Sequence, residues 1–234
     1  MRPEALAPVL AGQGRLHIPA IFEEASAQRI GAALTADQPW IRSLRASGAG
    51  GDMRGADWDA MTPAQHAAWR TLLLKGADGT LQYQFDSWRV SDQVEADQRL
   101  GGALAPIEAV YDWLNSETGL DFLRRLTGDA DCNYVDAQAT RYRPNDFLGR
   151  HHDDAPGKNR LYAYVLNFTP HWRADWGGVL LFLGDDGQVT QGYAPTFNAL
   201  NIFKVPQEHC VSSVVGHAPV PRLSITGWIR SARD

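Results

Sequence analysis

A series of short apolar segments fills the second half of the chain and constrains its fold most. Glycine, aspartate and proline residues separate these segments. Residues 134–142 alternate between apolar and polar side chains, which is typical of a half-buried strand. Residues 161–168 are almost continuously apolar, as expected for a strand covered on both faces. Together with similar segments at 178–183, 199–203 and 223–229, they predict a sandwich or jelly roll.

The first half of the chain has helical rather than alternating patterns. Residues 23–35, 104–114 and 119–126 place apolar side chains at helical spacing. Another helix is predicted to begin at Thr62 and Pro63, because threonine is a common N-cap and proline suits the first turn. Residues 47–55 are predicted to form a glycine-rich loop.

These patterns predict an α+β protein in which helices come first and a β core, either a sandwich or a jelly roll, follows. No linker rich in proline or serine separates the halves, so we expect a single domain over residues 1–234. Its supporting helices are expected mostly in residues 1–130, and its core at about 131–231.

Composition excludes several classes of protein. A net charge of −5 argues against a nucleic-acid partner, because such proteins normally carry a basic excess. No apolar run approaches the roughly 18 residues of a membrane span, so no membrane role is expected. The two cysteines are too few for a disulfide framework. A reduced, cytoplasmic protein is therefore predicted.

The segment Arg150-His-His-Asp-Asp154 offers metal ligands. On a strand, residues two apart share a face, so His151 projects with Asp153, and the next histidine with the next aspartate. Adding His209, just after the segment 199–203, gives two imidazoles and a carboxylate. That set leaves adjacent positions open on an octahedral ferrous ion, as oxygen activation requires, whereas zinc usually prefers four ligands richer in nitrogen or sulfur. A loop of solvated charges is the alternative.

The segment that begins at Arg222 offers an anion site. Arg222, Ser224 and Thr226 share one face of this strand. An arginine can hold a carboxylate through two parallel N–H bonds. If this face lines the interior, a dicarboxylate can bridge Arg222 and the metal. The alternative is an arginine at a strand edge, paired with a surface acid.

In combination, these motifs resemble the Fe(II)/2-oxoglutarate dioxygenase superfamily. Within it, the chain is most similar to the prolyl 4-hydroxylase-like group, which includes oxygen-sensing and ribosome- or elongation-factor-directed enzymes and their bacterial relatives. The resemblance covers roughly residues 134–230. It rests on the histidine and aspartate motif, His209, the strand 222–228, and the pair Gly177-Gly178; Arg160 also fits.

The resemblance implies that the core is a double-stranded β-helix, or jelly roll. It also implies that His151, Asp153 and His209 bind Fe(II). It favours this register over His152 and Asp154, because the flanking residues match the family. His217 is an alternative distal ligand, although it lies very near Arg222.

The same resemblance implies a 2-oxoglutarate site, with ascorbate as an additional candidate cofactor. Arg222 and Tyr142 would bind the C5 carboxylate, and Thr226 would donate a further hydrogen bond. Trp228 would lie near the metal. Asn167 stands where some relatives have a second tyrosine that binds the co-substrate.

The implied reaction consumes O₂ and hydroxylates a prolyl residue in a protein or peptide, releasing succinate and CO₂. By analogy, Trp88, Arg89, Trp172 and Trp176 are candidate substrate contacts. Hydroxylation of a free amino acid or another small molecule is the first alternative. A metal-dependent hydrolase and a non-catalytic jelly-roll binding module are the others.

Overall fold

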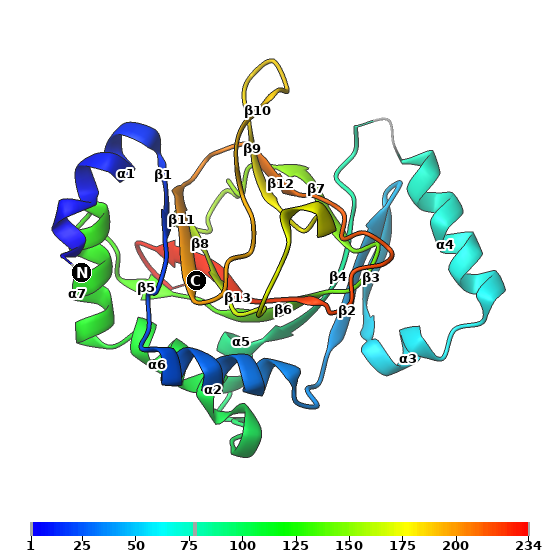
Figure 1. The fold of residues 1–234 in the computed structure, drawn as a ribbon, viewed down its shortest axis with the longest axis horizontal. Coiled ribbons are helices and arrows are strands. Elements are labelled where there is room, and N and C mark those ends of the chain that lie inside the picture. The colour runs from blue at the N-terminus through cyan, green and yellow to red at the C-terminus, as the bar shows by residue number, and fades with distance from the viewer. Residues whose placement is uncertain (1, 77–78, 234) are drawn as a thin grey trace.

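The computed structural model describes residues 2–76 and 79–233, and within them antiparallel strands form the middle of the molecule, with helices beside them (Figure 1). The strands are β1 (Arg15–Ile18), β2 (Ile41–Ala46), β3 (Ala49–Arg54), β4 (Tyr83–Arg89), β5 (Tyr134–Val135), β6 (Gln138–Tyr142), β7 (Phe147–His151), β8 (Arg160–Asn167), β9 (Leu180–Leu183), β10 (Val189–Tyr193), β11 (Ala199–Lys204), β12 (His209–Val211) and β13 (Arg222–Arg230). The helices are α1 (Ala7–Gln13), α2 (Glu24–Thr35), α3 (Gly55–Asp59), α4 (Pro63–Lys75), α5 (Val90–Glu95), α6 (Ala105–Leu114) and α7 (Glu117–Thr127).

The strands form two layers that β4 joins. One layer runs in the order β1-β11-β8-β13-β6-β4, and the other in the order β7-β12-β9-β10. The first residues of β4 pair with β7 and its last residues pair with β6. At the edges opposite β4, where β1 and β10 end the two layers, the Arg15 side chain of β1 donates hydrogen bonds to Gln191 (2.7 Å) and Thr190 (3.1 Å) of β10. This nearly closed arrangement confirms the predicted α+β class and double-stranded β-helix.

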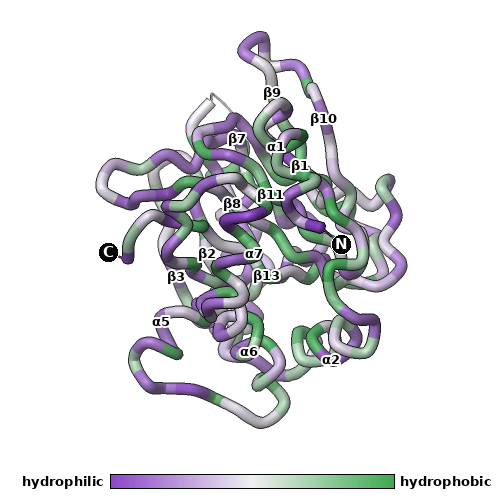
Figure 2. Tube along the Cα trace, turned by 90° about the vertical axis from the view of Figure 1, so that its left-hand side faces the viewer, coloured by the Kyte–Doolittle hydropathy of each residue, from purple (hydrophilic) through white to green (hydrophobic). Residues whose placement is uncertain are grey.

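Two hydrophobic cores hold this architecture together. Between the layers pack buried side chains such as Val165, Phe182 and Phe203. Beneath the larger layer, α2, α6 and α7 bury residues such as Leu34 and Ile107 against β8, β11 and β13. Figure 2 shows that hydrophobic residues gather in these strands and helices, while the outer loops are largely hydrophilic. The helices therefore support the sheet from outside, and the inner space is left to the candidate site.

The predicted helix at Thr62 is confirmed, whereas the predicted loop at 47–55 is wrong. Thr62 caps α4 through a reciprocal pair of hydrogen bonds with Gln65. Residues 49–54 form strand β3, which pairs with β2 along its whole length. The side chains of β3 are almost all exposed, so its pairing through the backbone leaves no hydrophobic pattern in the sequence. Among the described residues, no helix is both long and apolar enough to span a membrane.

Candidate active site

Two neighbouring strands bring the predicted metal ligands together. His151 at the end of β7 is paired directly with His209 at the start of β12, and their ring centroids lie 4.1 Å apart. Asp153 places Oδ1 3.6 Å from Nε2 of His151, and Oδ2 3.4 Å from Nε2 of His209. His151 and Asp153 do not share a strand face as predicted, because β7 ends at His151 and Asp153 has a φ of 63°. A left-handed residue, rather than a strand face, turns this carboxylate toward the imidazoles.

Backbone carbonyls orient both imidazoles. Nδ1 of His151 lies 2.9 Å from the Gly149 carbonyl oxygen, and Nδ1 of His209 lies 2.8 Å from that of Gln207. Since a carbonyl only accepts hydrogen bonds, each Nδ1 donates to it, and each Nε2 is turned toward the Asp153 carboxylate. Burial and the neighbouring His151 lower the pKa of His209 to about 4. His209 is therefore neutral near pH 7, the form that binds metals.

The donor atoms of these three residues fit a single ion. They all lie within 4.8 Å of one another. Ligands about 2.1 Å from one ion and at right angles are about 3 Å apart. Two imidazoles and one carboxylate are also the ligand set of oxygen-activating ferrous sites. The residues present therefore fit the predicted Fe(II).

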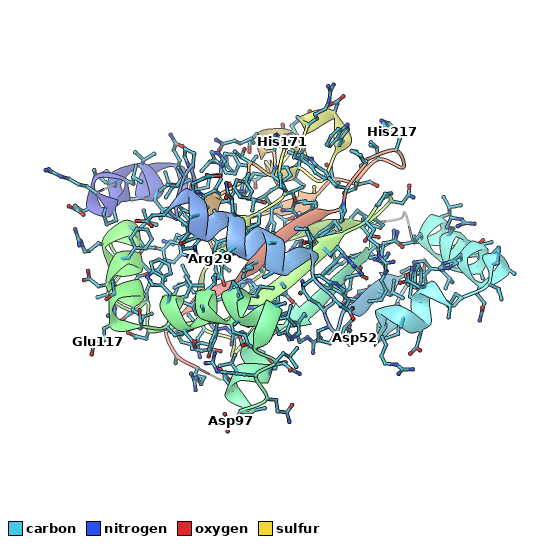
Figure 3. All side chains as sticks on the ribbon, turned by 60° about the horizontal axis from the view of Figure 1, so that its bottom comes forward. Arg29, Asp52, Asp97, Glu117, His171 and His217 are labelled. Carbon is cyan, nitrogen blue, oxygen red and sulfur yellow. The ribbon has the colours of Figure 1, made fainter. Side chains whose placement is uncertain are left out.

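The other candidate ligands lie elsewhere. His152 and Asp154 are exposed, and the backbone N–H of Asp154 donates to the His152 ring at 3.2 Å. His217 is also exposed, and Figure 3 shows it with His171 at the outer edge of the molecule.

A cavity of about 220 Å³, here called the central cavity, lies between the two strand layers and contains the three ligands in its wall. It is smaller than a site for a drug-sized molecule, which suits a small co-substrate. Arg222, Ser224 and Thr226 all line it, as their alternation along β13 predicts. The lining residues are Leu81, Tyr83, Phe85, Gln138, Thr140, Tyr142, Leu148, His151, Asp153, Ala163, Val165, Leu180, Phe203, His209, Val211, Arg222, Ser224, Thr226, Gly227 and Trp228.

Arg222 is a buried cation without a carboxylate partner among the described residues. It is 2% exposed, its Nε has no hydrogen-bond partner there, and its Cζ lies 5.0 Å from the Tyr142 ring centroid. Burial lowers the pKa of its guanidinium from the usual value, although Tyr142 opposes this shift. A buried charge is costly unless it is paired. Arg222 therefore marks a place for an anion.

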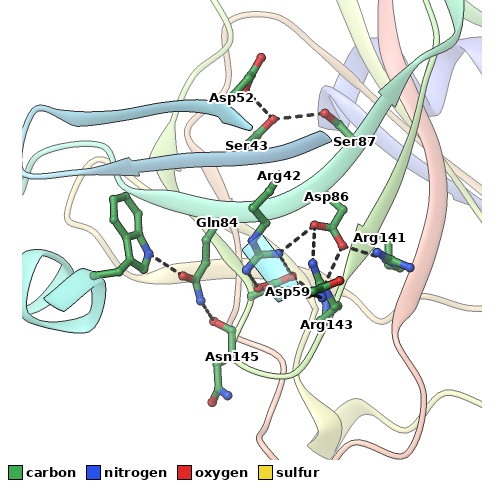
Figure 4. A network of polar contacts seen from close by, with 12 residues as sticks. Arg42, Ser43, Asp52, Asp59, Gln84, Asp86, Ser87, Arg141, Arg143 and Asn145 are labelled. Atoms are coloured by element: carbon green, nitrogen blue, oxygen red, sulfur yellow. Dashed lines mark hydrogen bonds and ion pairs between the residues drawn. The ribbon is translucent and has the colours of Figure 1, made fainter. Parts of the chain in front are cut away.

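Arg42 is equally buried, but carboxylates pair with its charge, as is usual for a buried arginine. It is also 2% exposed, but its guanidinium bonds the carboxylates of Asp86 and Asp146. Arg141 and Arg143 complete this network around Asp86, on the outer side of β4 (Figure 4). The contrast shows that the isolation of Arg222 is not a general property of buried arginines in this protein.

The glycine pair at 177–178 allows the chain to pack tightly behind Arg222. Gly178 has a φ of 63°, and a Cβ added there would lie 3.0 Å from Cδ of Arg222 and 3.3 Å from Cζ2 of Trp172. A larger residue would therefore press on the arginine stem. This close approach explains why the residue at 178 is a glycine.

The remaining predicted co-substrate residues differ in position. Tyr142 lines the cavity, and burial raises the pKa of its phenol, so its hydroxyl stays protonated and can donate. Trp228 also lines the cavity. Thr226 lines it too, with its hydroxyl donating to the Tyr164 carbonyl at 2.7 Å, so its hydrogen bond to a co-substrate stays a prediction. Asn167 is completely buried outside the lining.

None of the predicted substrate contacts lines the central cavity. Trp88 is buried in the outer core, Arg89 pairs with Asp52, and Trp172 packs edge-on against Trp176.

Sequence reasoning missed the cavity residues Tyr83, Phe85 and Gln138. Tyr83 and Phe85 lie two residues apart on β4, a spacing that puts them on one side of the strand but does not tell which side faces the candidate ligands.

With this geometry established, comparisons with known proteins become informative. The model of the 2OG-Fe(II) oxygenase superfamily matches residues 137–230. The family resemblance is confirmed over this part of the chain. The matched residues include the three candidate ligands and Arg222. No curated protein sequence matches the chain.

Solved structures with the same fold include several oxygenases. A Pseudomonas putida prolyl-4-hydroxylase has a TM-score of 0.60 at 17% identity, covering 98% of this chain and 99% of that one. A 2OG-Fe(II) oxygenase family oxidoreductase from Burkholderia pseudomallei has a TM-score of 0.64 at 16% identity, covering 99% and 92%. A Trichoplax adhaerens prolyl hydroxylase, in complex with a peptide of hypoxia inducible factor, has a TM-score of 0.57 at 12% identity, covering 98% and 91%. At such identities, the likeness establishes the shared fold.

Proposed function

We propose that this chain is an Fe(II)- and 2-oxoglutarate-dependent dioxygenase that hydroxylates a prolyl residue in a protein or peptide. One observation carries the proposal. A single cavity of about 220 Å³ contains both a His–Asp–His cluster and a buried arginine that has no carboxylate partner among the described residues. 2-Oxoglutarate has a carboxylate at each end and an oxo group beside one of them. It can therefore chelate a metal with one end and neutralise Arg222 with the other.

Each side chain then has a defined task. His151, Asp153 and His209 hold Fe(II), and Arg222 binds the C5 carboxylate through two N–H groups. Tyr142 donates its hydroxyl proton to the same carboxylate. When bound, the metal and co-substrate supply the oxidising chemistry, which consumes O₂ and yields succinate and CO₂. Apolar residues such as Phe203 exclude water from this reaction.

The prolyl substrate is supported by the names of the similar structures, two of which are prolyl hydroxylases. Room for a flanking chain supports a protein or peptide. Gln138 and Trp228 line both the central cavity and a neighbouring one of about 260 Å³. Fold alone does not determine a substrate, so the substrate needs a separate test.

The first experiment is a visible spectrum recorded under anaerobic conditions. Fe(II) is added with and without 2-oxoglutarate to the wild type, to Arg222→Ala and to Arg150→Ala. Arg150 is an exposed arginine beside His151 and outside the cavity lining, so it serves as the matched control. We expect a weak charge-transfer band that needs both additions and that only Arg222→Ala loses. No band with iron bound would contradict the 2-oxoglutarate assignment and favour a hydrolase or a binding module.

The second experiment measures succinate release, with ascorbate present. We expect capped proline-containing peptides to stimulate release and free amino acids not to do so. Stimulation by free amino acids alone would replace the peptide with a small-molecule substrate.

A further inference from the structure

Among the candidate metal ligands, Asp153 is the one whose position depends least on regular structure. Strand β7 ends at His151, and Asp153 follows in a left-handed conformation, which apart from glycine is adopted mainly by Asn and Asp. Its side chain is nevertheless only 8% exposed and lies within 3.6 Å of both imidazoles. Strand pairing does not hold this residue in place, so contacts from outside the segment contribute to its position.

Arg160, the first residue of β8, supplies such a contact. One of its terminal nitrogens donates a hydrogen bond of 2.9 Å to the backbone carbonyl oxygen of Asp153. Its Cζ lies 3.5 Å from the centroid of the Trp228 ring. An arginine stacks on an aromatic face through both its charge and its planar shape. The guanidinium therefore lies between the backbone of a metal ligand and an indole ring.

The indole belongs to a well-anchored part of the sheet. Trp228 is paired with Ala163 of β8, and its backbone N–H donates to Oδ1 of Asp136 at 2.7 Å. Strand β13 is bonded to β6 on one side and β8 on the other. Through Arg160, the irregular segment of Asp153 is thus attached to the centre of the larger layer.

We propose that Arg160 is a positioning residue that fixes the Asp153 carboxylate in the metal-binding arrangement, and that Trp228 holds Arg160 in place. The inference rests on the proposed function, because it takes Asp153 as a metal ligand. It adds to that function a determinant of metal affinity that does not touch the metal.

A positioning role of Arg160 and a purely electrostatic effect of its charge predict opposite changes in metal affinity when Arg160 is replaced. A positive charge close to a divalent cation repels it, so the loss of charge alone strengthens binding. The loss of a group that orients a ligand weakens binding, typically by 10- to 100-fold. The direction of the change in an Arg160 variant therefore distinguishes the two roles.

The experiment measures the affinity for Mn(II) alone, from the EPR signal of the free ion. The proteins are the wild type, Arg160→Ala, Arg160→Lys and the matched control Arg150→Ala. Arg150 lies next to His151, is 53% exposed, and pairs with Glu208, so its removal takes away the same charge without freeing Asp153. We expect at least about tenfold weaker binding for Arg160→Ala and unchanged or tighter binding for Arg150→Ala. Arg160→Lys should be intermediate, since an ammonium donates but does not stack in the same way.

A second measurement separates positioning from misfolding. Hydrogen exchange of residues 152–154 in the metal-free protein should be faster in Arg160→Ala, while exchange in β8 and β13 stays as in the wild type. Trp228→Leu keeps the charge but removes the ring, and should weaken Mn(II) binding in the same direction. If Arg160→Ala does not fold, Arg160→Lys and Trp228→Leu decide the matter.

The outcomes also separate the inference from the proposed function. Mn(II) binding to Arg160→Ala that equals or exceeds that of the wild type would overturn the role of Arg160 alone. Failure of the wild type to bind Mn(II) would overturn the metal site, and the inference with it.

Discussion

Replacing Arg222 with methionine should change stability and co-substrate binding in opposite directions. Arg222 is 2% exposed and has no carboxylate partner among the described residues, so the folded protein bears the cost of an unpaired buried charge. Breaking a buried ion pair costs about 3–5 kcal/mol, mostly because one charge is left unpaired. Methionine keeps most of the apolar stem and removes the charge. We expect Arg222→Met to be about 1–3 kcal/mol more stable without ligand.

The same substitution should remove 2-oxoglutarate binding. Loss of one member of a buried, hydrogen-bonded charge pair costs about 2–5 kcal/mol, which corresponds to roughly 30-fold to several thousand-fold in affinity. With Mn(II) present and 2-oxoglutarate at 100 times its dissociation constant, the wild type should gain about 2.7 kcal/mol in free energy of unfolding. Arg222→Met should gain almost nothing at that concentration.

Arg42→Met is the matched control. Arg42 is equally buried but pairs with Asp86 and Asp146, so its loss leaves carboxylates without their partner. We expect it to be about 3–5 kcal/mol less stable than the wild type. Urea unfolding measures all three proteins, with and without 2-oxoglutarate. The reasoning is refuted if Arg222→Met loses as much stability as Arg42→Met, or if 2-oxoglutarate still stabilises it fully.

Three further predictions concern single side chains. Tyr142→Phe should weaken 2-oxoglutarate binding by about tenfold, the value of one hydrogen bond to a charged group, in a calorimetric titration with Mn(II) present. Gly178→Ala should raise the dissociation constant of 2-oxoglutarate in the same titration, because its Cβ meets Cδ of Arg222 at 3.0 Å; unchanged binding would contradict this. Burial raises the pKa of Cys132 from 9.0 to about 11, so its contribution to stability is complete below pH 9 and is lost as pH rises to 11. Urea unfolding across this range should show a loss of about 1.4 kcal/mol per pH unit that Cys132→Ala lacks.

Local patterns predicted the elements of this fold well wherever side chains face a core. The apolar strand at 161–168 and the alternating face of Arg222, Ser224 and Thr226 both appear in the structure. Strand β3 escaped prediction because its side chains are exposed, so its pairing with β2 leaves no pattern in the sequence.

The candidate site was predictable in its residues but not in its geometry. The types and order of His151, Asp153 and His209 are enough to indicate a metal. Only the structure shows that Asp153 reaches the imidazoles from a left-handed residue beyond the strand. Likewise, the sequence does not show that the hydroxyl of Thr226 donates a hydrogen bond to the Tyr164 carbonyl of the neighbouring strand.

The sequence by itself determined which residues are candidates for chemistry and which core-facing segments are strands, because both depend on residue type and on spacing along the chain. The tertiary structure decided that β7 lies beside β12, that Arg222 has no acidic partner among the described residues, and that Gly178 packs against the Arg222 side chain. These features depend on contacts between segments far apart in the sequence. No local pattern encodes such contacts, since they arise when the two strand layers pack face to face.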